Sequence, residues 1–295
     1  MISNVRAGIV SAAVGCFVAL ASLPLPAELP DLATIPPDLK TPATIEGKPA
    51  PGLRVRQTTP GWEGHAVHHT LCLPVNWQRG VRFPVLVEYA GNGGYSNRFG
   101  DVSAGTVEGS NLGYGISGGS NYIWICLPFV AQVGNVKTNT VTWWGDVGET
   151  IAYCTNTVNY VCAQFGGDPK AVILCGFSRG AIACNFIGLH DDGIALLWRA
   201  FIAHSHYDGV NTNWPYAGAD RVSALARLKR LNGRPQFITH EGSTAATEKW
   251  LNSSGTTEPI TFEAIPFRNH SDQWTLRDIP ARRQLRAWLQ AQNLP

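Results

Sequence analysis

Residues 171–180 place a serine between two glycines, where an apolar run meets a helical pattern. The run AVILCG leads into Gly176-x-Ser178-x-Gly180, and the stretch AIACNFIGLH follows. A strand that turns this sharply into a helix needs glycine on both sides of the serine, because a Cβ there would clash. The turn holds the serine hydroxyl clear of the backbone, and the helix N-terminus favours negative charge on an attacked carbonyl. The segment therefore predicts a nucleophilic serine between a strand and a helix.

Extended and helical patterns alternate from residue 62 onward. This alternation predicts an α/β fold: a single doubly wound, mostly parallel sheet with helices on both faces. A chain of 295 residues with 44% hydrophobic residues can fill one such large domain. We expect strands at 65–74, 83–91, 122–130, 171–176, 200–204, 235–240 and 260–266, and helices at 147–165, 179–189, 219–231, 247–251 and 281–292.

The N-terminal 61 residues have a different composition. Arg6 precedes an apolar stretch that ends in the small-x-small pattern Ala19-x-Ala21, which predicts an export signal over 1–21 and a secreted or periplasmic protein. A membrane anchor fits this stretch less well, because its Gly, Ser and Ala content makes it marginal as a span. Residues 24–51 contain eight prolines. We therefore expect 22–61 to be an extended linker or strap, and 62–295 to be the catalytic domain.

The charge pattern narrows the range of partners. The net charge is only +2, no basic block occurs, and charged residues make up 15% of the chain. Neither a nucleic acid nor, after signal cleavage, a membrane surface is an expected partner. No Cys-x-x-Cys or phosphate-binding Gly-x4-Gly-Lys motif occurs either, so we expect no cofactor and no metal.

The segment 91–119 carries ten glycines and follows the expected strand 83–91. Its start, Ala90-Gly91-Asn92-Gly93-Gly94, lies well ahead of the serine in the chain. Glycine lets backbone N–H groups approach a reacting carbonyl oxygen closely. Asn92 and Gly93 are therefore the candidates for an oxyanion hole, and the rest of the segment is expected to be a surface loop.

A serine hydroxyl needs a neighbouring base, and the base needs a carboxylate that fixes its tautomer. His270 follows the last expected strand in a loop before the C-terminal helix. Glu241 ends the penultimate strand and is the preferred carboxylate. Asp208 follows the strand before that one and is the alternative acid.

These features together resemble the α/β-hydrolase superfamily over residues 62–292. The resemblance is carried by the Gly91–Gly94 turn, the lead-in from Asp168 to the GFSRG turn, and His270. It is closest to secreted esterases that act on carbohydrate esters or polyesters, and it implies hydrolysis through an acyl-enzyme. Ser178-Arg179 is also similar to the Ser-Arg turn of glucuronoyl-esterase-type enzymes, which adds Arg179 to the expected oxyanion hole.

Two other functions fit parts of the sequence. The run His204-Ser-His206-Tyr-Asp208 could place ligands on one metal ion, as metal-dependent hydrolases do, although Gly209 stands where a final histidine would be. A catalytically inactive binding module on the same fold is the third reading.

The substrate is less constrained by the sequence. About 28 residues separate Asp208 from Gln236, which leaves no room for a large lid domain, so an open site for polymer-borne or bulky polar esters is expected. The pair Trp143-Trp144 is a candidate surface for stacking a sugar or aromatic ring.

Overall fold

The computed structural model describes residues 28–292, so the expected signal at 1–21 lies outside the described residues. Its centre is a nine-stranded sheet in which only β3 runs antiparallel to the other strands. The strand order is β1-β2-β3-β7-β4-β10-β11-β12-β13. The strands are β1 (Thr44–Ile45), β2 (Arg54–Gln57), β3 (His69–Cys72), β4 (Phe83–Tyr89), β7 (Ile123–Leu127), β10 (Gly167–Phe177), β11 (Ala200–His204), β12 (Gln236–Glu241) and β13 (Ile260–Ile265).

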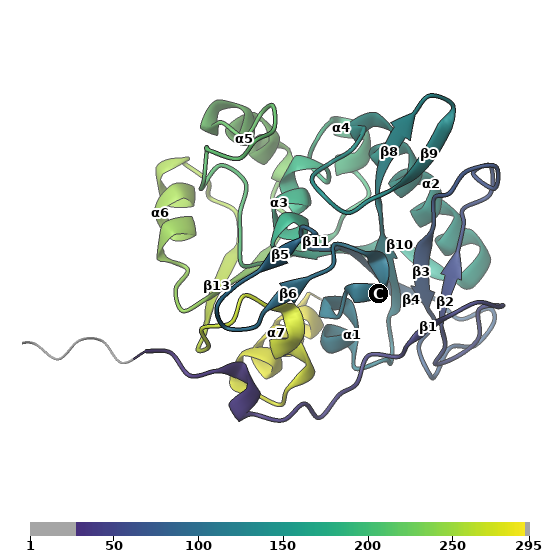
Figure 1. Ribbon diagram of the computed structural model, residues 1–295, viewed down its shortest axis with the longest axis horizontal. Helices are drawn as coiled ribbons and strands as arrows, with labels where there is room; N and C mark the ends of the chain where they lie inside the picture. The colour runs from purple at the N-terminus through teal and green to yellow at the C-terminus, as the bar shows by residue number, and fades with distance from the viewer. Residues whose placement is uncertain (1–27, 293–295) are drawn as a thin grey trace, which may run out of the picture.

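Helices cover both faces of this sheet, and each face has its own hydrophobic core. One core packs beneath α2 (Val147–Phe165), α3 (Arg179–Phe186), α5 (Arg221–Leu228) and α6 (Ala245–Ser253). The other packs beneath α1 (Leu112–Ser117) and α7 (Pro280–Ala291), which lie against each other (Figure 1). The predicted doubly wound, mostly parallel sheet is confirmed. A further short helix, α4 (Asp192–Ala195), follows α3.

The two ends of helix α2 are determined by capping residues in the local sequence. Asp146 caps its N-terminus by accepting a hydrogen bond from the backbone N–H of Glu149, at 2.9 Å. Gly166 ends it in the left-handed conformation, at φ 76°. Between them, Tyr153 and Val158 are buried against the sheet. The helix occupies the residues expected from the sequence.

The segment expected as a loop is more ordered than predicted. It contains the hairpin of β5 (Tyr95–Ser96) and β6 (Val102–Ser103), followed by α1. A second unpredicted hairpin joins β8 (Phe129–Val133) to β9 (Val136–Thr140) directly after β7. In Figure 1 this β8–β9 hairpin rises above the sheet.

The Pro-rich segment lies on the domain and also contributes to it. Strands β1 and β2 join the central sheet, so the sheet begins before the expected boundary at residue 62. Upstream, the Leu32 N–H donates to Asn269 Oδ1 at 2.7 Å, and the Arg268 N–H donates to Pro30 O at 3.1 Å. Asp31 forms an ion pair with Arg268 at 2.9 Å. Figure 1 shows this segment running from the α7 side of the molecule to the β1–β2 edge.

Two further findings concern the length of the apolar helices and the state of the cysteines. Within residues 28–292, no helix combines the length and the apolar character needed to cross a membrane.

The six described cysteines (Cys72, Cys126, Cys154, Cys162, Cys175 and Cys184) are all free and buried. Burial raises the pKa of each of these thiols, for example that of Cys72 to about 11, so they pack as small apolar side chains.

Candidate active site

Ser178 occupies the sharp turn between β10 and α3. Its backbone has φ 55° and ψ −115°, a conformation that a non-glycine residue adopts only under constraint. The constraint comes from close packing, because a Cβ on Gly180 would overlap the Tyr89 carbonyl, and one on Gly176 would overlap the Gly180 backbone. The Ser178 N–H donates to the His204 carbonyl at 2.9 Å and fixes the turn to the neighbouring strand. Its hydroxyl is left at the surface of a cavity.

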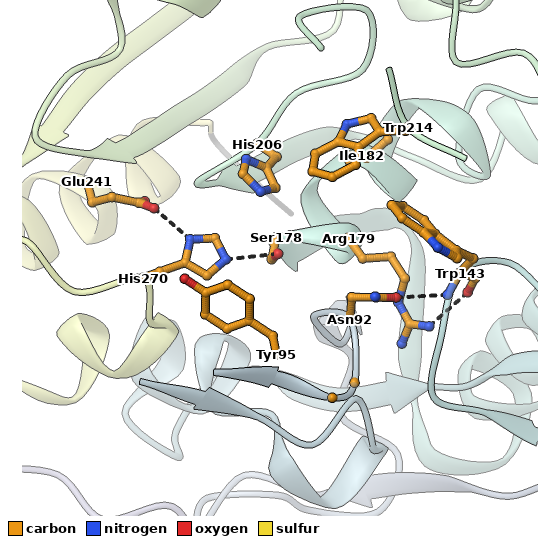
Figure 2. Close-up of a pocket in the computed structure, with 12 residues that line it drawn as sticks. Asn92, Tyr95, Trp143, Ser178, Arg179, Ile182, His206, Trp214, Glu241 and His270 are labelled. Atoms are coloured by element: carbon orange, nitrogen blue, oxygen red, sulfur yellow. Dashed lines mark hydrogen bonds and ion pairs between the residues drawn. The ribbon is translucent and has the colours of Figure 1, made fainter. Parts of the chain in front are cut away.

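His270 bridges Ser178 and Glu241. Its Nε2 lies 3.0 Å from Ser178 Oγ, and its Nδ1 lies 2.6 Å from Glu241 Oε1 (Figure 2). Glu241 is the last residue of β12, and His270 lies in the loop after β13. The structure therefore brings together the three residues that the sequence analysis selected, in the order hydroxyl, imidazole, carboxylate.

The environment of Glu241 keeps its carboxylate ionised. Burial alone would raise the pKa of Glu241, but the hydrogen bond with His270 and the nearby imidazoles of His204 and His240 outweigh burial and hold that pKa well below its usual range. An ionised carboxylate can only accept hydrogen bonds, so the proton between it and His270 belongs to Nδ1. Nε2 then presents its lone pair to the Ser178 hydroxyl.

Asp208, the alternative acid, is bound elsewhere. Its carboxylate makes a bidentate ion pair with Arg227, at 2.7 Å and 3.0 Å, and is 1% exposed. The two histidines of the expected metal motif also diverge. His204 contacts Thr239 and the Ser271 carbonyl, whereas His206 lines the cavity. Among residues 28–292, no group of three His, Cys, Asp or Glu side chains has metal-site geometry.

The oxyanion-hole expectation needs one correction. The Gly93 N–H donates to the Val141 carbonyl at 2.6 Å, so it is not a free donor. The Asn92 side-chain Oδ1 accepts from the Trp143 N–H at 2.8 Å, which leaves its Nδ2 without a partner in the described chain. The backbone N–H groups of Asn92 and Arg179 have no hydrogen-bond partner within the described chain, and both residues line the cavity. These two groups are the backbone donors for an oxyanion.

The Arg179 side chain lies beneath the cavity rather than in it. Its guanidinium donates to the carbonyls of Trp143, Gly91 and Gly105, at 2.8, 2.9 and 3.3 Å, and stacks on Phe129 at 4.1 Å. The residue is 1% exposed and has no carboxylate partner within residues 28–292. Burial lowers its pKa to about 9, which still leaves it protonated at neutral pH. A positive charge without a counter-ion therefore lies below the nucleophile.

The cavity above Ser178 has a volume of about 520 Å³. Trp143, Trp214 and Ile182 form an apolar wall on one side, and the indole rings of the two tryptophans are 5.4 Å apart. Tyr95 and His206 lie on opposite sides of the line from His270 to Ser178 (Figure 2). Trp143 is held in an unusual backbone conformation, at φ 47°, by its bonds to Asn92 and Arg179.

Three residues that the sequence patterns did not single out also contact His270. The Ser205 hydroxyl contacts both Glu241 and His270, and Asp101 accepts the His270 backbone N–H at 2.8 Å. Tyr95 packs its ring 4.7 Å from the His270 ring. Asp101 and Tyr95 belong to the segment read as a surface loop. The signal available for Ser205 was its place directly after a strand that adjoins the serine-bearing strand.

Comparison with known proteins informs the fold. No family model matches the chain, and no curated protein matches it significantly. Among solved structures, an inhibited esterase B from Lactobacillus rhamnosis is 13% identical with a TM-score of 0.52, over 84% of this chain and 89% of its own. A putative dipeptidyl aminopeptidase IV from Bacteroides ovatus is 13% identical with a TM-score of 0.53, over 76% of this chain. A thermostable esterase is 12% identical with a TM-score of 0.50, over 81% of this chain.

The chain has the α/β-hydrolase fold. It spans 33% of the length of the aminopeptidase and 62% of that of the thermostable esterase. At these identities the likeness concerns the fold, so the chemistry has to be argued from this chain's own residues.

Proposed function

We propose that this protein is an exported serine esterase that hydrolyses carboxylic esters through an acyl-enzyme. The observation that carries the proposal is the hydrogen-bonded series from Ser178 Oγ through His270 to Glu241, at 3.0 Å and 2.6 Å. Ser178 is the nucleophile, His270 the general base and then the general acid, and Glu241 the carboxylate that orients the imidazole.

In the proposed reaction, Ser178 Oγ attacks the ester carbonyl carbon while His270 Nε2 takes the hydroxyl proton. The Asn92 and Arg179 backbone N–H groups donate to the resulting oxyanion, and the buried Arg179 charge lowers its energy further. When the tetrahedral intermediate collapses, the bond to the alcohol breaks and Nε2 protonates the departing oxygen. A water molecule then repeats the two steps on the acyl-enzyme and releases the acid and the free serine.

For the substrate, we propose a bulky polar ester on a neutral ring, such as a carbohydrate-linked ester. Arg179 is the only cationic side chain at the cavity among the described residues, and its guanidinium is buried under carbonyl groups, so an anionic uronate would find no accessible counter-charge. Uncharged polar groups without partners in residues 28–292 line the cavity instead: Asn92 Nδ2, the indole N–H groups of Trp143 and Trp214, and the His206 ring. Aromatic faces combined with neutral donors suit a hydroxylated ring.

Labelling with a serine-directed phosphonate tests the chemistry. We expect one phosphonyl group on Ser178 by peptide mass spectrometry, none on Ser178→Ala, and ester turnover that a chelator leaves unchanged. Full activity in Ser178→Ala, or loss of activity with chelator, would instead support a metal-dependent hydrolase. A protein that neither reacts with phosphonate nor turns over any ester of an acetyl, feruloyl, glucuronoyl and polyester panel would be a binding module.

A second experiment tests the ring subsite. Trp143→Ala should raise KM for an acetylated neutral oligosaccharide about 10-fold or more, because it removes the stacking surface. Hydrolysis of p-nitrophenyl acetate, which is too small to need that surface, serves as the internal control. Preference for a methyl glucuronate ester over neutral sugar esters would contradict the substrate proposal while leaving the serine chemistry intact.

Export is tested separately, because the proposed signal lies in residues 1–27, outside the described part of the chain. N-terminal sequencing of protein recovered from the periplasm or medium should start at or soon after Ser22. Protein that begins at Met1 and remains in the cytoplasm would contradict export.

A further inference from the structure

The first three residues of the run expected as a metal motif, His204 to His206, lie around His270 in the structure. His204 Nε2 contacts the Ser271 carbonyl at 3.0 Å, directly beside His270, and the His206 ring lies 5.2 Å from the His270 ring. The residue between them makes the closest contacts. We propose that Ser205 is a positioning residue, whose hydroxyl holds Glu241 and His270 in the arrangement that activates Ser178. This inference rests on the serine-esterase function proposed above.

Three atoms form a closed triangle at this point. Ser205 Oγ lies 2.9 Å from Glu241 Oε1 and 2.8 Å from His270 Nδ1, and these two atoms are 2.6 Å apart. Only two hydrogens are available for the three edges, one from the hydroxyl and one from the imidazole, because the carboxylate is ionised. The Ser205 O–H donates to Oε1, and the Nδ1–H is shared between Oε1 and Ser205 Oγ.

The opposite assignment fails on the same distances. If the Ser205 hydroxyl donated to Nδ1, that nitrogen would carry no hydrogen and would face the Glu241 carboxylate as a second acceptor at 2.6 Å. The triangle therefore favours the tautomer with hydrogen on Nδ1. That tautomer leaves the Nε2 lone pair directed at Ser178 Oγ, as proton abstraction requires.

The backbone places the Ser205 hydroxyl for this contact at some cost. Ser205 has φ 84°, in the left-handed region that glycine adopts without strain, and it is 1% exposed. Its N–H donates to the Thr239 carbonyl at 2.8 Å, which ties the turn to β12, the strand that carries Glu241. Glycine would adopt this φ with less strain than serine, so the presence of serine indicates a role for the hydroxyl itself.

The test compares Ser205→Ala with Ser205→Gly, using p-nitrophenyl acetate. Both variants lose the hydroxyl, but only the glycine variant also relieves the backbone, so a role for the hydroxyl predicts the same loss in both. We expect kcat to fall about 10- to 100-fold, as for a lost hydrogen bond to a charged group, with KM unchanged. Ser253→Ala is the control, because the Ser253 hydroxyl donates to the Trp250 carbonyl on α6 and not to the triad, and it should retain full activity.

A double-mutant cycle separates positioning from a merely structural role. If Ser205 acts through Glu241, Ser205→Ala should change kcat less than about 2-fold in a Glu241→Ala background. An equal loss in both backgrounds, wild-type kcat in Ser205→Ala, or full activity in Ser205→Gly would each overturn the inference. Circular dichroism spectra and denaturant melts check that the variants are folded, because neither depends on the reactivity of Ser178. An active Ser178→Ala would instead overturn the proposed function, so the two failures are distinguishable.

Discussion

Strands β10 and β11 are neighbours, and each is followed directly by a serine with a positive φ. Their register pairs Phe177 with His204, so Ser178 and Ser205 occupy equivalent places, at φ 55° and 84°. The Ser178 N–H bonds to the strand beside it through His204 O, and the Ser205 N–H bonds to the next one through Thr239 O. The same backbone conformation thus directs the Ser178 hydroxyl to the cavity and the Ser205 hydroxyl to the buried side of the His270 imidazole.

Only one of these turns has a sequence signature. After Ser178 the chain enters α3 at once and packs against the β4 backbone, so Gly176 and Gly180 are required. After Ser205 no helix begins until α5, at Arg221, and Ala203 and Tyr207 stand at the positions equivalent to Gly176 and Gly180. Both serines therefore have a strained backbone, but glycines are needed only around Ser178, where the neighbouring backbone packs closely.

The largest expected effect distinguishes the carboxylate of Glu241, at the end of β12, from that of Asp208, after β11. Glu241→Gln should lower kcat about 10³- to 10⁴-fold, because an amide can donate to His270 and stabilise the wrong tautomer. Asp208→Asn should keep most of the turnover and instead cost about 3 kcal/mol in the free energy of unfolding, because it breaks a buried pair with Arg227. Turnover assays and denaturant melts measure both. If Asp208→Asn is inactive and Glu241→Gln is active, then Asp208 and not Glu241 is the carboxylate that orients His270.

The packing explanation for the glycines is tested by Gly180→Ala. A Cβ there meets the Tyr89 carbonyl, which is backbone and cannot move aside, so we expect a loss of more than about 3 kcal/mol in unfolding free energy or no soluble protein. Gly148→Ala, on the exposed face of α2, is the control and should stay within about 1 kcal/mol of wild type. A Gly180→Ala protein of normal stability would refute the packing argument.

Arg179 places a buried positive charge beneath Ser178. Arg179→Met should lower kcat about 100-fold, since it removes both the positive charge and the ties from the guanidinium to Trp143 and Gly91. Arg283→Ala, which removes an exposed guanidinium from α7, should leave kcat unchanged. If Arg179→Met loses stability but keeps its kcat, the guanidinium is a structural tie alone.

The smallest effect concerns pH. Burial lowers the pKa of His204 and His206 to about 4 and that of His69 to about 3, so from pH 6.5 downward the unfolded chain binds more protons and stability falls. Burial raises the pKa of Glu88 to about 7, which has the opposite sign: its contribution is lost as pH rises from about 4.5 to 7. The three histidines outweigh this one group. His204→Gln should therefore flatten the acid slope by about 1 kcal/mol per pH unit averaged over pH 5 to 7, and Glu88→Gln should steepen it. Denaturant melts from pH 5 to 7 measure both slopes.

Sequence reasoning succeeded where a pattern is local. The range 147–165 is helix α2 and 200–204 is strand β11, as predicted. The proximity of Ser178, His270 and Glu241 followed from the rule that parallel strands present their carboxyl ends at one edge of a sheet.

Elements whose formation depends on tertiary packing, against the helix propensity of their own residues, were not predicted from the sequence. Helix α1 contains Gly113 and Gly115, which are poor helix formers, but a Cβ on either would overlap Trp124 or Thr275. The buried carboxylate of Glu88 holds the first turn of this helix through the Gly113 N–H, at 2.8 Å. The occupied Gly93 N–H and the Ser205 contacts likewise depend on loops from distant parts of the chain.

Residues 30–32 of the Pro-rich segment contact the loop that carries His270. Pro30, Asp31 and Leu32 hold Arg268 and Asn269, the two residues that immediately precede His270. The expected cleavage site lies only about nine residues upstream. Proteolysis that trims the chain past Leu32 would therefore release the loop of the general base without touching the triad. Under the proposed export, the position of N-terminal cleavage would then affect the proposed esterase activity.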